Sequence, residues 1–173
     1  LVTFTIYSGN SDNIKERIER GLLDVGLLQE PVDISKYSFV RTPCREQWGV
    51  LVHEDSELAS KESVSPAELA SVPLILPERE SVQNELFNWF GSYAESLRIT
   101  ATGNLLYNLA SLARASGGSV LTLNLDCNYE GLRFIPLSPP LESNTVLVWK
   151  KTQTLSTAAA AFIEFSEKYI SGI

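Results

Sequence analysis

The fold is decided by Gly21-Leu22-Leu23-Asp24-Val25-Gly26-Leu27-Leu28-Gln29-Glu30-Pro31, which joins the end of a helix to a short apolar strand. Glycine is the residue that most often ends a helix, and the apolar run over residues 25–28 has the length of a buried strand. Before this stretch, Ile14, Ile18 and Leu22 recur at four-residue spacing among charged residues. This spacing predicts one amphipathic helix that Gly21 ends.

Residues 2–7 precede this helix and are β-branched or aromatic, which favours a strand. Between strand and helix, residues 8–11 (Ser-Gly-Asn-Ser) provide a tight turn and good helix-capping side chains. A strand, a capped helix and a second strand form a βαβ unit, whose two strands we expect to lie parallel in one sheet.

Strands and helices continue to alternate along the chain, a pattern typical of open α/β sheets rather than of a sandwich or a helix bundle. We expect further strands at residues 48–52, 73–77, 98–102, 119–123, 132–137 and 145–149. Helices are expected after Ser65, over residues 82–93, and from a Gly103-Asn104 cap to a stop at Gly117-Gly118. In the last of these, the inward residues are expected to be Leu105, Leu109, Leu112 and Ala113. A last helix is expected after Ser156, with Phe162, Phe165 and Tyr169 facing inward.

The composition is that of a soluble globular protein with a real core, because 44% of the 173 residues are hydrophobic. The chain is long enough for one domain or two small lobes. It has no apolar run that could span a bilayer and no signal-peptide pattern. The net charge of −7 argues against binding of nucleic acid by this chain itself. Cys44 and Cys127 lack metal-binding spacing, which favours a reduced, cytoplasmic protein, although a redox pair is an alternative.

The chain begins within a predicted strand at Leu1 and contains no methionine. We therefore expect it to be a fragment of a longer polypeptide.

Small molecules bind open α/β sheets at the carboxyl ends of the strands, where loops meet helix N-termini. Three loops have this position: residues 8–11, 78–81 and 103–104. Their serine and asparagine side chains suit a polar or anionic group, but they are equally good helix caps. Arg79 is the basic side chain of these loops, and it can bind an anion or pair with Glu78 or Glu80.

Sequence motifs for catalysis, for metals and for cofactors are lacking. The single histidine, His53, has no paired nucleophile or second ligand, and no phosphate-binding glycine loop or matched carboxylate pair occurs. We therefore expect no enzymatic activity, no metal and no cofactor.

Six blocks of residues, in this order and spread over the whole chain, resemble the effector-binding (substrate-binding) domain of LysR-type transcriptional regulators. They are residues 7–11, 21–26, 48–52, 55–59, 73–76 and 147–151. The resemblance implies two Rossmann-like subdomains of the type II periplasmic-binding-protein kind, with a ligand cleft between them. Residues 1–53 and 143–173 would form the first subdomain, truncated at its N-terminus, and residues 54–142 the second.

The resemblance also implies which residues contact the effector. In the first subdomain they are Asn10 and Ser11, and Ser8 of the same loop is a further candidate from its position before the helix. In the second they are Glu78, Arg79, Ser81, Gly103, Asn104 and Asn124. Gly117-Gly118 departs from the Gly-x-Gly usual in the family after the second-subdomain helix.

The partners implied are a small effector, polar or anionic, and a second copy of the chain in a homodimer or homotetramer. In the family's dimer, the helix near residues 12–21 of one copy packs on the helix near 81–93 of the other. DNA would be bound only through an N-terminal winged helix-turn-helix that this chain lacks, and no membrane is involved.

The leading hypothesis is therefore a cytoplasmic sensor domain whose effector alters the placement of attached DNA-binding domains. A stand-alone solute-binding protein of a transporter is the alternative, and a small α/β enzyme is a third reading.

Overall fold

The computed structural model describes residues 2–172 and divides the chain into two compact units. Unit 1 comprises Leu1–Arg45 and Asn144–Ile173, and unit 2 comprises Glu46–Ser143. The terminal residues 1 and 173, which the predicted first subdomain includes, lie outside the described residues. Residues 46–53, which the sequence analysis placed in the first subdomain, belong to unit 2 because they pair with its strands. The assignment of two regulatory subdomains stays a prediction.

Unit 2 is built on a mixed sheet. Its strand order is the part of β2 (Tyr37–His53) from residue 46 onward, then β5 (Ser119–Leu123), β3 (Pro73–Pro77) and β4 (Arg98–Gly103), and β6 (Leu132–Pro136) also pairs with this part of β2. The β3 strand runs parallel to β4 and β5, whereas β2 runs antiparallel to β5 and β6. The parallel part confirms the predicted α/β pattern, because the connections from β3 to β4 and from β4 to β5 each contain a helix.

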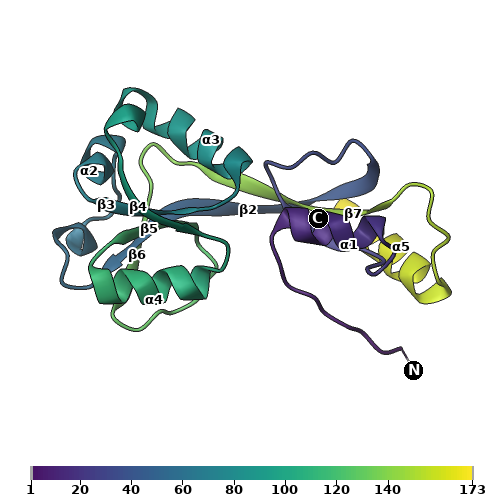
Figure 1. Cartoon of the computed structure of the whole chain (residues 1–173). Helices are drawn as coiled ribbons and strands as arrows, with labels where there is room; N and C mark the ends of the chain where they lie inside the picture. Colours follow the sequence, from purple (N-terminus) through teal and green to yellow (C-terminus); the bar gives the residue numbers. More distant parts are fainter. Residues whose placement is uncertain (1, 173) are drawn as a thin grey trace. The chain divides into compact units, whose positions relative to one another are not determined.

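Helices cover both faces of this sheet (Figure 1). On one face lie α2 (Pro66–Ala70) and α3 (Glu80–Phe90), and on the other lies α4 (Leu106–Ser116). Successive side chains of β3 point to opposite faces of the sheet. Leu74 and Leu76 pack with α3 on one face, and Ile75 packs with α4 on the other. Short 3-10 helices, η1 (Glu57–Ser60) and η2 (Gly91–Ser96), complete the unit.

Unit 1 has a smaller core. It contains α1 (Ser11–Glu19), β1 (Gly26–Gln29), the residues of β7 (Glu142–Lys150) from 144 onward, and α5 (Thr157–Ser171). The β1 strand pairs antiparallel with β7, with Leu27 opposite Leu147. Ile18 of α1 packs on Leu28 and on two β7 valines, so the predicted helix and the predicted strand after it are both present.

The expected strand over residues 2–7 is wrong. These residues form no strand ladder, and Phe4 and Ile6 are 74% and 89% exposed. The predicted parallel βαβ pair is therefore absent, because a strand needs a neighbour to satisfy its backbone groups and none of residues 2–172 supplies one here. Tyr7 still contacts α1, since the Arg17 guanidinium lies 3.8 Å from the centre of its ring.

Two helix faces also differ from expectation. In α5 the inward residues are Ile163 and Ser166, whereas the predicted inward aromatic residues are exposed: Phe162, Phe165 and Tyr169. In α4 the buried residues are Leu109, Ala110 and Ala113, and the predicted Leu105 and Leu112 are exposed. In both cases the apolar side chains occur on more than one side of the helix, and packing selects a face that periodicity alone does not.

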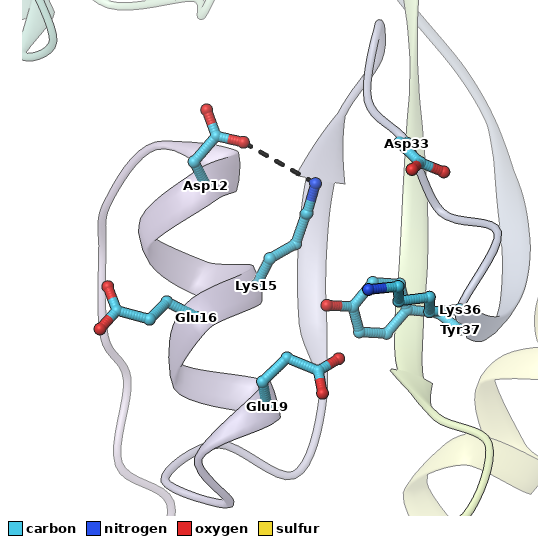
Figure 2. Close-up of a pocket in the computed structure, with 7 residues that line it drawn as sticks. All are labelled: Asp12, Lys15, Glu16, Glu19, Asp33, Lys36 and Tyr37. Atoms are coloured by element: carbon cyan, nitrogen blue, oxygen red, sulfur yellow. Dashed lines mark ion pairs between the residues drawn. The ribbon is translucent and has the colours of Figure 1, made fainter.

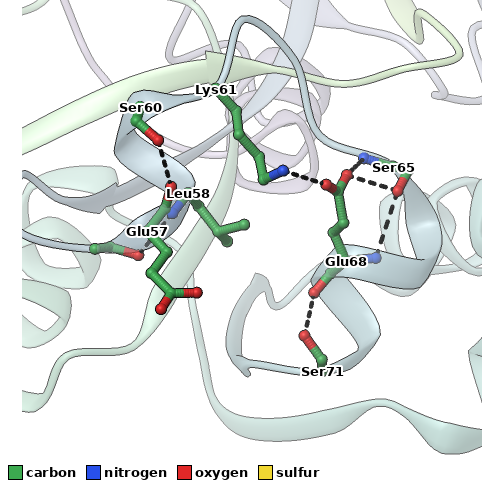
Figure 3. Close-up of polar contacts among 8 residues, drawn as sticks. Glu57, Leu58, Ser60, Lys61, Ser65, Glu68 and Ser71 are labelled. Atoms are coloured by element: carbon green, nitrogen blue, oxygen red, sulfur yellow. Dashed lines mark hydrogen bonds and ion pairs between the residues drawn. The ribbon is translucent and has the colours of Figure 1, made fainter.

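The start of α2 confirms its predicted cap and shows a polar network in unit 2 (Figure 3). Ser65 and Glu68 form a capping box: the Ser65 N–H donates to Glu68 Oε2 at 2.8 Å, and the Glu68 N–H donates to Ser65 Oγ. The Lys61 ammonium lies 2.7 Å from Glu68 Oε1. The hydrogen bond from Lys61, with those from Ser65, lowers the pKa of Glu68 to about 2.

Each unit carries one cysteine with a free, exposed thiol: Cys44 lies in unit 1 and Cys127 in unit 2. Within residues 2–172, no helix has both the length and the apolar character needed to cross a bilayer.

Candidate functional site

The carboxyl ends of β5, β3 and β4 meet at one edge of the unit 2 sheet. Pro77 at the end of β3 is in register with Gly103 at the end of β4, and the Glu78 N–H donates to the Gly103 carbonyl at 2.9 Å. Asn124 directly follows β5, which is parallel to β3 and therefore ends at the same edge. The structure thus brings together all the candidate effector residues that the sequence analysis placed in the second subdomain.

The loop from β3 into α3 turns at Arg79, which is the N-cap residue of the helix. The Arg79 side chain makes no capping hydrogen bond, while its carbonyl accepts from the N–H groups of Val82 and Gln83. The Gln83 side chain donates to the Pro77 carbonyl at 2.7 Å and so ties the first turn of α3 to the strand end. Ser81 lies exposed in this first turn, where helical N–H groups favour an anion.

The segment after β4 positions two more candidates. At Gly103 an added Cβ would lie 2.6 Å from Leu109 Cδ2, so any larger residue would have to displace the Leu109 side chain. Asn104 is exposed, but it is not the helix cap that the sequence predicted, because α4 begins after Leu105. Asn124 Oδ1 accepts from the Asp126 N–H at 3.2 Å and so shapes the loop after β5.

The three candidates of unit 1 surround the start of α1. Ser8 is exposed and precedes the helix. Asn10 is the N-cap, and its Oδ1 accepts from the Asn13 N–H at 2.9 Å. Ser11 is 5% exposed, and its hydroxyl donates to the Gln29 carbonyl at 3.3 Å. Asn10 therefore caps α1, and Ser11 attaches the start of α1 to the end of β1.

Sequence reasoning missed Gln29 as a candidate. Its side-chain Nε2 is buried and has no hydrogen-bond partner among residues 2–172. The backbone carbonyl of Gln29 accepts a hydrogen bond from the Ser11 hydroxyl. The buried amide donor therefore belongs to the residue that connects β1 with the start of α1. A polar residue at the end of an otherwise apolar strand is a weak sequence signal, and the burial of its amide could not be predicted.

A charged cavity of about 330 Å³ in unit 1 was also missed (Figure 2). It lies between α1 and the segment over residues 33–37. Burial, together with a hydrogen bond donated to the Glu19 carboxylate, raises the pKa of Tyr37 to about 12. The Tyr37 hydroxyl correspondingly lowers the pKa of Glu19, with a further contribution from Lys150, whose ammonium lies 3.4 Å from Glu19 Oε2.

The histidine and the acidic residues are not arranged for catalysis or for metal binding. His53 Nδ1 accepts from the Asp55 N–H at 3.3 Å at the end of β2. In the part of the chain that the structure describes, no three His, Cys, Asp or Glu side chains are grouped to hold a metal ion.

Solved structures share this fold at low sequence identity. The effector-binding domain of QuiR, in complex with shikimate, superposes with a TM-score of 0.80 at 17% identity, covering 98% of this chain and 82% of that one. HinK, a LysR family transcriptional regulator from Pseudomonas aeruginosa, superposes with a TM-score of 0.75 at 18% identity, covering 95% of this chain and 59% of HinK. The protein thus has a type II periplasmic-binding-protein-like α/β fold.

The family model described as the LysR substrate binding domain matches residues 1–170. The chain therefore belongs to the LysR substrate-binding domain family. It is also 24% identical over 180 residues to YwbI of Bacillus subtilis (strain 168), an uncharacterized HTH-type transcriptional regulator. That match covers 98% of this chain but only 58% of YwbI, so the chain spans a little over half of that regulator.

Proposed function

We propose that this chain is the effector-sensing part of a cytoplasmic LysR-type regulator, and that its effector controls DNA binding by a helix-turn-helix domain of the same protein. The main observation behind this proposal is that, in a member of this family, polar groups lie together at the carboxyl ends of β5, β3 and β4. The QuiR domain was solved with a small molecule, shikimate, which supports a small-molecule effector here.

The residues of unit 2 provide the contacts for a polar or anionic effector. Arg79 supplies a guanidinium for bidentate contact with a carboxylate or phosphate. Ser81 and the first turn of α3 supply further hydrogen-bond donors. Glu78, Gly103, Asn104 and Asn124 complete this set.

In unit 1 the proposed contacts are Asn10 and Ser11, which the family resemblance implies, and Ser8 of the same loop. The buried Gln29 amide adds a donor beside Ser11. A buried donor without a partner is costly to the folded protein, and a ligand oxygen that accepts from it would remove that cost.

The domain acts by differential binding and not by chemistry. An effector that binds one conformation of the regulator more tightly than another shifts the population toward it, and the same free energy changes DNA binding by linkage. A solute-binding role in transport has no support among the related proteins named above, which are described as regulators or as domains of regulators.

We also propose that the regulator is a homodimer or homotetramer, with α1 of one copy packed on α3 of the other. Light scattering coupled to size exclusion tests the oligomeric state. Charge reversal at Arg20, an exposed residue just after α1, should weaken the dimer if α1 is at the interface. A monomer at high concentration would contradict this proposal.

The test of effector binding is a thermal-shift screen against amino acids, organic acids, sugar phosphates and aromatic acids. A ligand that binds only the folded state raises the melting temperature, and the rise grows with the logarithm of the ligand concentration above its Kd. Arg79→Ala should then weaken an anionic ligand by about 1.5–3 kcal/mol.

Arg98→Ala is the matched control, because Arg98 begins β4 and lies at the opposite edge of the same sheet. It should leave the affinity unchanged. Equal affinity of Arg79→Ala and the unaltered chain would remove Arg79 from the site, and no shift with any compound would contradict effector binding by this chain.

A further inference from the structure

The cavity in unit 1 is open to solvent on one side and is lined by charged side chains from two segments. Four residues of α1 at helical spacing line one wall: Asp12, Lys15, Glu16 and Glu19. The opposite wall is formed by Asp33, Lys36 and Tyr37 (Figure 2). A polar helix face normally points to bulk water, whereas here a second charged segment faces it across a cavity of about 330 Å³. That volume is within the range of about 300–1,000 Å³ typical of small-molecule sites.

Part of this lining is fixed by contacts within the protein. Glu19 accepts from the buried Tyr37 hydroxyl and pairs with Lys150, which also donates to the Glu19 carbonyl at 3.2 Å. Asp33 Oδ1 accepts from the Ser35 N–H at 3.0 Å. These contacts hold the two walls in place, and they are formed within the protein without any ligand.

Lys15 is the side chain best placed to bind a ligand. It is 25% exposed, and its ammonium lies 3.8 Å from Asp12 Oδ1, which is beyond hydrogen-bond distance. In Figure 2 its ammonium projects into the space between α1 and the segment that carries Asp33. The Lys15 ammonium has three donors, and a ligand carboxylate provides strong acceptors for them.

The other charged side chains of the lining favour a ligand whose other end is positively charged. The lining contains four carboxylates and two ammonium groups, which gives a net charge of −2. A molecule that carries one carboxylate and additional positive charge therefore matches the lining better than a simple anion does.

We propose that this cavity is a second small-molecule site, which takes a basic amino acid with its carboxylate on Lys15 and its cationic end toward the carboxylates of the lining. The site shares no residue with the proposed effector set, so the two binding proposals can be tested separately, although one wall of the cavity is α1, the helix proposed above for the dimer interface.

The test is a titration of the ¹⁵N-labelled chain with L-arginine, followed by backbone amide shifts. Saturable shifts are expected in residues 12–19 and 33–37. Agmatine, which is arginine without its carboxylate, should bind more weakly than L-arginine, and L-glutamate should bind more weakly still because the lining is net negative.

Lys15→Ala should weaken L-arginine about tenfold, the effect of losing one charge-assisted hydrogen bond, and should leave agmatine unchanged. Lys168→Ala is the control, since Lys168 lies on α5 and is exposed in a pair with Glu164. Lys36→Ala provides a second variant should the first fold poorly, and it should also weaken L-arginine selectively.

Three outcomes would overturn the proposal. The first is the absence of saturable shifts with L-arginine up to about 10 mM. The second is shifts that occur around residues 8–11, 78–81 and 103–104 instead of the cavity. The third is an equal loss of L-arginine and agmatine affinity in Lys15→Ala, which would mean that Lys15 does not hold the carboxylate.

Discussion

Unit 2 buries apolar side chains on both faces of its sheet, whereas unit 1 has one small buried cluster and leaves many apolar side chains in water. In unit 2, α3 covers one face and α4 the other. In unit 1, the core lies between α1 and the strands β1 and β7, while Phe4, Ile6, Leu27 and Phe165 are more than half exposed. Because buried apolar area supplies most of the folding free energy, unit 2 should be the more stable part of the chain.

The largest expected effect follows from removing an anchor of the unit 2 core. Phe90 is 1% exposed and packs in the larger cluster, so Phe90→Ala should lower the free energy of unfolding by about 3–5 kcal/mol. Urea unfolding, read by amide exchange, measures this loss. If the protection of β3 and β5 amides stays unchanged, the two-faced core is not what stabilises unit 2.

A second prediction concerns the alkaline side of unit 1. The pKa of Tyr37 is raised from 10.0 to about 12, so its contribution to stability is complete below pH 10 and is lost as the pH rises toward 12. Tyr37→Phe should cost about 1.5–3 kcal/mol at pH 7, because the hydroxyl bonds a charged carboxylate. The variant's stability should also fall less steeply above pH 10.

The exposed Tyr107 gives the control for this experiment, and Tyr107→Phe should leave both the stability and its pH dependence unchanged. Parallel curves for Tyr37→Phe and the unaltered chain between pH 10 and 12 would show that Tyr37 is not protected from ionisation.

Unit 2 should show the opposite pH response, on the acid side. The pKa of Glu68 is lowered from 4.5 to about 2, so its contribution is complete above pH 4.5 and is lost as the pH falls through 2. Glu68→Gln keeps the capping geometry but removes the charge that binds Lys61. It should cost about 1 kcal/mol at pH 7 because the pair is partly exposed, and this difference should disappear in acid.

Acid titration of thermal unfolding measures the effect of Glu68→Gln. Glu62→Gln is the control, since Glu62 is exposed in the same segment and should change little. A cost that stays constant from pH 7 to 2 would assign the effect to packing and not to charge.

The smallest effect is expected on the exposed side of α5. Phe165 is 66% exposed and stacks on Tyr169 in solvent, so Phe165→Ser should change stability by less than about 0.5 kcal/mol. Ile163→Ala on the buried side should cost about 2–4 kcal/mol, as is usual for a core isoleucine. Similar losses for the two variants, measured by urea unfolding, would mean that Phe165 is covered in solution.

Local sequence signals predicted the parts of the fold that local chemistry determines. The Ser65 cap, the proline-bounded β3 strand, and the helix ended by Gly21, whose φ is +69°, are all present. The strand over residues 2–7 was wrong because strand formation depends on a partner elsewhere in the chain, which propensity does not report. The prediction of the inward face of α5 was wrong because the helix has aromatic residues on one side and an aliphatic residue on another, and the pattern does not show which side is buried.

The candidate sites divide in the same way. Placing Glu78, Gly103 and Asn124 at one edge required only the order of parallel strands, which the alternating pattern predicts. The cavity beside α1 depends on where the segment over residues 33–37 lies, and loops without periodicity give no such signal. The helical spacing of Asp12, Lys15, Glu16 and Glu19 was visible in the sequence, but it is equally typical of a solvated helix face.

The two exposed thiols give this chain a built-in pair of attachment points for spectroscopic labels. Cys44 and Cys127 fall in different units, and the sequence contains no other cysteine. Maleimide dyes or nitroxides can therefore be attached without mutating any residue. Energy transfer or dipolar spectroscopy on the labelled chain then reports directly whether a bound effector changes the separation of the two units.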